Sequence, residues 1–341
     1  MKELIQKVVD GQDLTREETA RAMDLMLEGE ASQVQMASFL TALRLKGETV
    51  EEIIGCTQMM KSKAGRLSPL ITKDYIDFVG TGGDGTNTFN ISTTSAFVCA
   101  AAGVTVAKHG NRAASSKSGS ADLLEALGIN IMLEPEQVSE CVNKIGFGFM
   151  NAQKFHKAMK NVAPVRVELG IRTIFNMLGP LSNPSDATRQ VIGVFSAEMV
   201  PVFANVMAGL GVKNALVVHG NDGMDEITVT TTTLVNEIRD GEITEYTIDP
   251  ADYGIPYSDG ADLKGGTGAE NAEIARAIFA GEKGAKRDIV VLNSAAGLYI
   301  GKKAATFADG VKLAQEIIDS GKAMEKVREM AEFTNSFGGN A

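Results

Sequence analysis

A glycine-rich segment at residues 80–85 has the spacing Gly-x-Gly-x-x-Gly, the first pattern in this chain that could do chemistry. It follows an apolar stretch at residues 75–79 and precedes a helical pattern that begins near Ser92. A glycine loop between a strand and a helix exposes backbone N–H groups that can bind a phosphate. A plain tight turn has the same spacing, so the neighbouring residues must distinguish the two.

The charge that follows the next predicted strand argues against a nicotinamide site. A dinucleotide fold needs an acidic residue there for the ribose hydroxyls. The strand predicted at residues 104–107 runs instead into Lys108 and His109, which favours a second phosphate or an anionic substrate. A Walker A loop is excluded as well, because no Gly-Lys-Ser/Thr follows the glycines.

Two further segments are rich in groups that bind phosphate. Residues 108–122 combine cations, hydroxyls and two glycines before a predicted helix at 122–127, and residues 89–93 open a helix with hydroxyl and amide donors. Either segment alone fits a solvated loop or an N-cap cluster. Beside the glycine loop, we interpret both as walls of one anion site.

An acidic pair, Asp225 and Glu226, follows the strand predicted at residues 215–218. Magnesium is usually held by one or two carboxylates together with substrate phosphates, so this pair near phosphate loops predicts Mg²⁺. A polar turn is the alternative. Arg166 suits the bidentate binding of a carboxylate, and a salt bridge at a domain junction explains it equally well.

Other catalytic chemistries lack a pattern. The histidines at 109, 156 and 219 have no i,i+4 spacing, which argues against zinc. No serine occupies a nucleophile elbow, no Cys/His dyad is evident, and no catalytic acid or base can be assigned.

The elements that position these residues alternate between helix and strand after residue 68. Residues 1–68 read as helices, because Thr15, Ser32 and Thr49 each begin a capping box. Later apolar stretches predict strands at 215–218 and 289–292, and Asp240-Gly241 predicts a hairpin between 234–238 and 243–248. Residues 171–178 read as a helix that packs back on the N-terminal helices. Alternating strands and helices imply a mostly parallel α/β sheet.

Composition excludes several classes of protein. The 341 residues are 44% hydrophobic and 22% charged, which is typical of a folded globular protein long enough for two domains. A net charge of −10 and the absence of tryptophan disfavour a protein that coats nucleic acid or a membrane surface. Three dispersed cysteines and an N-terminus without an apolar signal region predict a cytoplasmic protein.

Read together, these segments resemble the anthranilate phosphoribosyltransferase family. The resemblance rests on residues 77–85, 88–93, 108–127, 164–184 and 225–226, and it covers nearly the whole chain. It implies transfer of the phosphoribosyl group from phosphoribosyl pyrophosphate to anthranilate, the second step of tryptophan synthesis from chorismate. The prolines that often flank the family's pocket histidine are missing around His156, so the acceptor-side loop departs from the family pattern here.

The resemblance also implies roles for individual residues. Ser92, Asp225 and Glu226 would hold Mg²⁺, and Gly80, Asn111, His156 and Arg166 would face anthranilate. The donor site would comprise Gly80, Thr81, Gly82, Gly83, Asp84, Thr88, Asn90, Ile91, Ser92, Thr93, Lys108, His109, Gly110, Asn111, Arg112, Ala113, Ala114, Ser115, Ser116 and Ser120.

The implied architecture is a small helical domain on a larger α/β domain, with the active site in the cleft between them. We place the helical domain at residues 1–70, joined by a returning segment at about 168–184, and the donor-binding α/β domain at 71–341. The resemblance further implies a homodimer through the helical domain. Two rivals are a pyrimidine nucleoside phosphorylase, which the intact donor segments disfavour, and a non-catalytic nucleic-acid-binding relative, which the negative charge disfavours.

Overall fold

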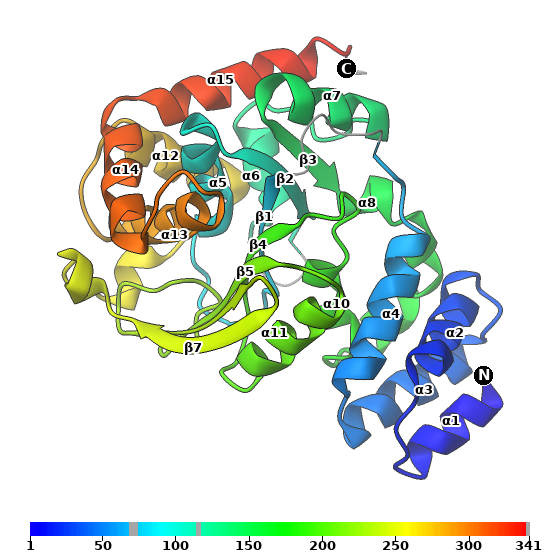
Figure 1. Cartoon of the computed structure of the whole chain (residues 1–341). Coiled ribbons are helices and arrows are strands. Elements are labelled where there is room, and N and C mark those ends of the chain that lie inside the picture. The colour runs from blue at the N-terminus through cyan, green and yellow to red at the C-terminus, as the bar shows by residue number, and fades with distance from the viewer. Residues whose placement is uncertain (68–73, 114–116, 339–341) are drawn as a thin grey trace.

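A computed structural model describes residues 1–67, 74–113 and 117–338 of the chain. One mixed sheet, with strand order β3-β2-β1-β4-β5-β6-β7, forms its centre (Figure 1). The strands are β1 (Tyr75–Gly80), β2 (Thr105–Gly110), β3 (Phe147–Asn151), β4 (Arg189–Gly193), β5 (Asn214–Gly220), β6 (Thr233–Arg239) and β7 (Glu242–Ile248). The predicted fold class is confirmed.

Strands β1 to β5 are parallel, and β1 lies between β2 and β4. The strand order reverses beside β1, since β2 and β3 lie on one side of it and β4 and β5 on the other. Ligands of open α/β sheets bind outside the carboxyl ends of the strands at such a switch point. The glycine loop begins at this point, directly after β1.

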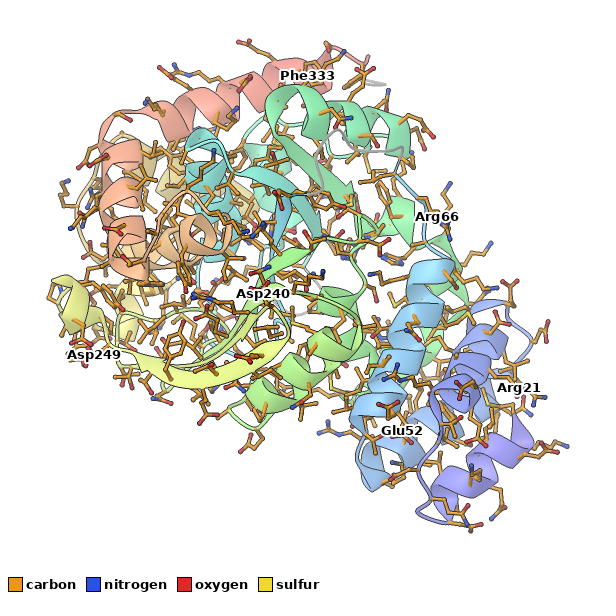
Figure 2. The ribbon with its side chains drawn as sticks, in the orientation of Figure 1. Arg21, Glu52, Arg66, Asp240, Asp249 and Phe333 are labelled. Atoms are coloured by element: carbon orange, nitrogen blue, oxygen red, sulfur yellow. The ribbon has the colours of Figure 1, made fainter. Side chains whose placement is uncertain are left out.

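The two remaining strands form the predicted hairpin. β6 pairs antiparallel with β5 and with β7. At its tip Asp240 has φ 51° and Gly241 has φ 93°, the two positive values that a type I′ turn requires (Asp240 is labelled in Figure 2). This prediction from the Asp-Gly pair is confirmed.

Alternate residues of the central strands face two separate cores. In β4 and β5, Val191, Leu216 and Val218 pack in the larger core, while Ile192 and Val217 pack in the smaller one. The period of two in side-chain direction explains this division. The helices that follow the N-terminal bundle are α5 (Ile91–Ala101), α6 (Ser120–Ala126), α7 (Pro135–Ile145), α8 (Ala152–Phe155), α9 (Ala163–Leu169), α10 (Phe175–Leu181), α11 (Met199–Gly209), α12 (Gly268–Phe279), α13 (Ala285–Ile300), α14 (Phe307–Asp319) and α15 (Lys322–Asn335).

The N-terminal helices form a bundle at one end of the molecule (Figure 1). They are α1 (Lys2–Val9), α2 (Arg16–Leu27), α3 (Gln33–Lys46) and α4 (Val50–Ser62). All three predicted capping boxes are confirmed, since the hydroxyls of Thr15, Ser32 and Thr49 each accept from the backbone N–H three residues on, and the backbone N–H of each donates to the side chain of that same residue. The bundle shares its core with α10 and α11.

A buried carboxylate stabilises this bundle. Glu52 is 0% exposed and lies among the helices (Figure 2). Its oxygens accept from the backbone N–H of Leu14 at 2.9 Å and of Thr49 at 2.8 Å, and from Lys46 Nζ at 3.0 Å. Burial of a charge is tolerated where partners of this kind meet it.

Two sequence predictions need correction. Residues 289–292 are not a strand but part of α13. Because this helix is buried on all sides, its apolar residues do not recur with the helical period that would identify a helix in the sequence. The returning helix does not span 171–178 but Phe175–Leu181, and Ile171 is exposed. Pro180 lies inside this helix and lacks the N–H that would donate to the carbonyl four residues earlier. As predicted, this helix packs with the N-terminal bundle.

The domain boundaries at about residue 70 and at 168–184 stay predictions, and residues 68–73 lie outside the described residues. Among the helices of the described residues, none has the length and apolar character to cross a membrane.

Candidate active site

The loop after β1 needs its glycines for two different reasons. Gly82, Gly83 and Gly85 have φ values of 65°, 73° and 78°, in the region that favours glycine. At Gly80 the reason is steric, because a Cβ there would collide with Asp225 Oδ2. The loop therefore exposes backbone where it curves and is packed tightly where it leaves the sheet.

The acidic pair reaches this loop from a distant part of the sequence. Gly82 N donates to Asp225 Oδ2 at 2.7 Å, and Ser92 N at the start of α5 donates to Glu226 Oε1 at 3.1 Å. The structure thus brings together three segments that the sequence singled out: the glycine loop, the start of α5 and the acidic pair.

These carboxylates carry more negative charge than their surroundings compensate. Burial raises the pKa of Asp225, and the nearby Asp84 carboxylate raises it further. Burial and Asp225 raise the pKa of Glu226 in the same way. A divalent cation would favour the charged form of such carboxylates, so their place beside a loop that can bind phosphate is suited to a metal ion.

The metal site is incomplete on the protein side. Within the described residues, no three His, Cys, Asp or Glu side chains gather closely enough to hold a metal ion. Magnesium commonly takes one or two carboxylates and completes its shell with substrate phosphates and water. The donor set is therefore suited to a metal that arrives with a phosphorylated ligand.

Lys108 is the buried cation of the site. It lies in β2, its residue is 2% exposed, and its ammonium donates to the Phe78 carbonyl of β1. Burial lowers the pKa of Lys108, while the charges of Asp77 and Glu226 oppose that shift. An ammonium held beside the acidic pair at the switch point can compensate negative charge on a ligand.

A buried polar network fixes the end of β2. Asp77 Oδ1 accepts from His109 N at 3.2 Å, and Asn183 Nδ2 donates to Asp77 Oδ2 at 2.7 Å and to the Ala107 carbonyl at 2.9 Å. Burial raises the pKa of Asp77 to about 6, and Lys108 counters part of this effect. The network positions the backbone that carries Lys108 and His109.

The segment after β2 is anchored to α6. Asp122 accepts from Ala113 N at 3.0 Å, and Arg112 pairs with Asp122 at 2.9 Å and with Glu125 at 2.8 Å. Ser120 Oγ donates to the Asn111 carbonyl at 3.3 Å. Arg112 therefore already pairs with two carboxylates, and Ala114, Ser115 and Ser116 lie outside the described residues.

Asn90 links this segment to the start of α5. Its Oδ1 accepts from Ser118 Oγ at 3.0 Å and from Asn271 Nδ2 at 2.8 Å. Thr88 forms a bridge with Lys264, and Ile91 and Thr93 are buried. These contacts hold the predicted donor walls together.

Two buried histidines, His109 of the predicted donor site and His156 of the predicted acceptor site, meet at the end of β2. The ring centroids of His109 and His156 are 5.0 Å apart, and His156 Nε2 lies 3.1 Å from the Ser182 carbonyl. Burial lowers the pKa of His109 to about 3 and that of His156 to about 4. Both rings are therefore neutral near pH 7.

Arg166 lies apart from this pair. Its guanidinium stands 5.3 Å from the centroid of the Phe175 ring, and burial lowers its pKa. No carboxylate pairs with it in the part of the chain that the structure describes, so the alternative of a junction salt bridge finds no support there.

Sequence reasoning missed two contributors to the site. Gly193 ends β4, an unpredicted strand, and a Cβ there would collide with the Asp225 carbonyl oxygen. Arg172 donates to the Gly83 carbonyl of the glycine loop and lines a cavity of about 240 Å³. Gly193 could have been found from the sequence, because a glycine at the end of a strand is a recognisable signal. Nothing in the sequence indicates that Arg172 contacts the glycine loop.

Comparison with known proteins agrees with this geometry. Residues 2–64 match the glycosyl transferase family, helical bundle domain, and residues 72–324 match the glycosyl transferase family, a/b domain. An anthranilate phosphoribosyltransferase of Acetivibrio thermocellus is 58% identical over 337 residues, covering 99% of this chain and 97% of that protein.

Solved structures agree as well. The crystal structure of anthranilate phosphoribosyltransferase from Thermus thermophilus matches with a TM-score of 0.92 at 43% identity, covering 97% of this chain and 99% of that one. The Saccharomyces cerevisiae enzyme in complex with PRPP and Mg matches with a TM-score of 0.88 at 27% identity, covering 98% of each chain. This chain belongs to the glycosyl transferase family and, within it, to the anthranilate phosphoribosyltransferases.

Proposed function

We propose that this chain transfers the phosphoribosyl group of 5-phosphoribosyl 1-pyrophosphate (PRPP) to the amine of anthranilate, giving N-(5-phosphoribosyl)anthranilate and pyrophosphate. The observation that carries the proposal is the meeting of the glycine loop with Asp225 and Glu226 beside buried Lys108. Relatives that cover almost the whole chain bear the name of this activity. The reaction is the second step of tryptophan synthesis from chorismate.

The donor diphosphate binds at the carboxyl ends of β1 and β2. The Gly82 N–H already donates to Asp225, so the other backbone N–H groups of the glycine loop and the ammonium of Lys108 are the donors beside the acidic pair. Asn90 and Ser92 extend the site at the start of α5. Pre-organised N–H groups and a buried cation stabilise an oxyanion without proton transfer. The other donor residues predicted from the sequence, including Asn111 and Ser120, complete the same wall.

Mg²⁺ is the metal that this site fits, and Ser92, Asp225 and Glu226 would hold it. Their uncompensated charge fits such a cation, and the yeast relative is described in complex with PRPP and Mg. Bound there with the diphosphate, the ion would neutralise negative charge on the leaving group.

Anthranilate binds beside Gly80, Asn111 and the His109–His156 pair, with Arg166 toward its carboxylate. Neutral imidazoles can contact an aromatic ring or a neutral amine without burying another charge. Arg166 is half-buried and has no ion pair in the described part of the chain, so its guanidinium can bind a carboxylate.

In the reaction, the anthranilate nitrogen forms a bond to C1 of the ribose with inversion, and the C1–O bond to pyrophosphate breaks. Pyrophosphate leaves with the electron pair of that bond, and the nitrogen then loses a proton. Because an aromatic amine is neutral at pH 7, no strong base is needed to generate the nucleophile. Stabilising the leaving pyrophosphate is the larger task, and the loop N–H groups and Lys108 serve it.

Loss of anthranilate fluorescence tests the proposal. The purified chain is mixed with anthranilate, PRPP and Mg²⁺, and the signal is expected to fall only when all are present. The matched rival assay offers phosphate and a pyrimidine nucleoside. Phosphorolysis without loss of anthranilate would assign the chain to the nucleoside phosphorylases instead.

We also propose that the chain forms a homodimer through its helical bundle. Val34 and Leu45 on α3 are 76% and 82% exposed, and Val167 on α9 is 82% exposed. Val34 and Leu45 lie near the two ends of α3, which packs against α9, and large exposed apolar side chains on adjoining helices can mark an interface. Light scattering should give twice the chain mass, and Leu45→Glu with Val167→Glu should give the monomer.

The cytoplasm is the proposed compartment. Cys56, Cys99 and Cys141 are buried free thiols, as expected where a reducing environment prevents disulfides.

A further inference from the structure

We propose that Arg172 is a positioning residue: it orients the glycine loop for the donor and connects this loop to the N-terminal helical bundle. The inference rests on the proposed function, because it assigns Arg172 a part in binding PRPP. Arg172 lies between α9 and α10, far from the glycine loop in the sequence.

The contact is specific to one carbonyl of the loop. Arg172 Nη2 donates to the Gly83 carbonyl, while Asp225 accepts from the N–H of the preceding glycine, Gly82, at 2.7 Å. The loop is therefore held from two sides, by a guanidinium on one peptide group and by a carboxylate on another. Gly83 has φ 73°, and a Cβ added there would lie 3.5 Å from Arg172 Nη2.

Fixing this carbonyl also fixes an N–H group. In a trans peptide the C=O and the N–H of one peptide unit point in opposite directions. The Gly83 carbonyl belongs to the same peptide unit as the Asp84 N–H. Arg172 therefore determines the direction of the Asp84 N–H, which lies in the part of the loop that precedes the α5 N-terminus and can bind an oxyanion.

The guanidinium is itself held in place. Its central carbon stands 4.5 Å from the centroid of the Phe195 ring, and Phe195 follows β4 closely. A planar guanidinium can stack on an aromatic ring and donate from its edge at the same time, whereas a lysine ammonium has no plane to stack. This arrangement distinguishes an arginine from any other cation.

Arg172 also connects the loop to the N-terminal bundle. Phe175 and Leu178 of α10, a few residues on, are buried in the core shared with α1 to α4. The cavity of about 240 Å³ beside Arg172 is lined from the bundle by Arg44 and Glu48. A movement of the bundle relative to the sheet would therefore reach the Gly83 carbonyl through this short segment.

Three variants test the proposal: Arg172→Ala, Arg172→Lys and the matched control Arg44→Ala, which lines the same cavity without a hydrogen bond to the loop. We expect Arg172→Ala to raise the KM for PRPP about tenfold, because a hydrogen bond from a charged group is lost. The KM for anthranilate and the thermal midpoint should change little. Arg172→Lys should recover part of the loss, and Arg44→Ala should match the parent chain.

Hydrogen exchange gives a readout that needs no activity. In the chain without substrates, the amides of residues 80–90 should exchange faster in Arg172→Ala than in the control. Should Arg172→Ala fail to fold, Phe195→Leu removes the stacking alone and should raise the KM for PRPP about two- to fivefold.

Unchanged loop exchange together with an unchanged KM for PRPP would overturn the proposal. A fall in thermal midpoint with all kinetic constants changed alike would also overturn it, since that pattern marks a merely structural residue. A parent chain that leaves anthranilate unconsumed would refute the proposed function instead, and the exchange experiment would still test the Arg172 contact.

Discussion

Two regions of this molecule withdraw carboxylates from water, and they do so in opposite ways. In the helical bundle, Glu52 accepts from two backbone N–H groups and from the ammonium of Lys46. At the glycine loop, Asp225 and Glu226 each accept from a backbone N–H. Burial still raises both pKa values, and Asp84 beside Asp225 and Asp225 beside Glu226 raise them further.

The partners that the fold supplies to a buried carboxylate distinguish a structural role from a functional one. Where the fold supplies donors for a carboxylate, the group stabilises the fold. Where the fold leaves negative charge uncompensated beside exposed backbone N–H groups, a ligand must supply the compensation. We therefore expect that removing the carboxylate in the bundle lowers the stability of the fold, and that removing a carboxylate at the loop lowers the catalytic rate.

The largest expected effect is that of Glu226→Ala on turnover. We expect kcat to fall on the order of a hundredfold or more, as does the loss of a group that stabilises charge in the transition state. The thermal midpoint should not fall, since a repelled carboxylate is removed. Steady-state kinetics at saturating Mg²⁺ checks this, with Glu226→Gln as the isosteric control. An unchanged kcat would refute a metal role for Glu226.

Next comes Glu52→Gln in the bundle. The change leaves the Lys46 ammonium, which also pairs with Asp13, with a weaker second partner, and it weakens two buried backbone hydrogen bonds, so the free energy of unfolding should fall by about 2 kcal/mol. Urea denaturation measures this loss, and kcat of the folded enzyme should equal that of the parent chain. A variant as stable as the parent chain would show that Glu52 does not stabilise the bundle, and the proposed difference between the two regions would be wrong.

Arg166→Ala should have a smaller effect, confined to the acceptor. Losing one charged contact to a group remote from bond breaking should raise the KM for anthranilate about tenfold and leave kcat nearly unchanged. Lys160→Ala, a nearby exposed cation, is the control. If the KM for PRPP moved instead, the acceptor pocket would be wrongly assigned.

The smallest effect is a slope of stability with pH. Burial lowers the pKa of His109 to about 3 and that of His156 to about 4, so the unfolded chain, with histidine pKa values near 6.5, takes up protons first. The histidine contribution to stability is therefore fully present above about pH 6.5 and is lost as pH falls toward 4. Each histidine contributes up to about 1.4 kcal/mol per pH unit in that window.

Urea denaturation between about pH 7 and about pH 4.5, within this window, checks the slope. His156→Gln should remove about half of the histidine contribution. The same slope in the parent and the variant would show that His156 is protonated in the folded chain.

Local signals in the sequence predicted much of the fold. The capping boxes, the Asp-Gly hairpin and the strand before the glycine loop all depend on residues that are neighbours in the chain. The helix α13 was missed because it is buried on every side, and its apolar run 289–292 then looks like a strand. The strand β4 was missed because it is short and begins with Arg189 and Gln190.

The site divides in the same way. Its segments could be found from residue types, and the contacts between them could not. The sequence contains no sign that Asp225 reaches Gly82, that Asp77 supports the backbone of His109, or that Arg172 reaches Gly83. These contacts depend on which strand ends lie side by side, and the topology of the sheet decides that.

A crystal structure of the chain with PRPP and Mg²⁺ would test whether the glycine loop and the acidic pair form one donor site. We expect the diphosphate within hydrogen-bond distance of the loop N–H groups and of Lys108, and the metal at the carboxylates of Asp225 and Glu226. A donor bound elsewhere, with the acidic pair and the glycine loop free of ligand, would contradict it.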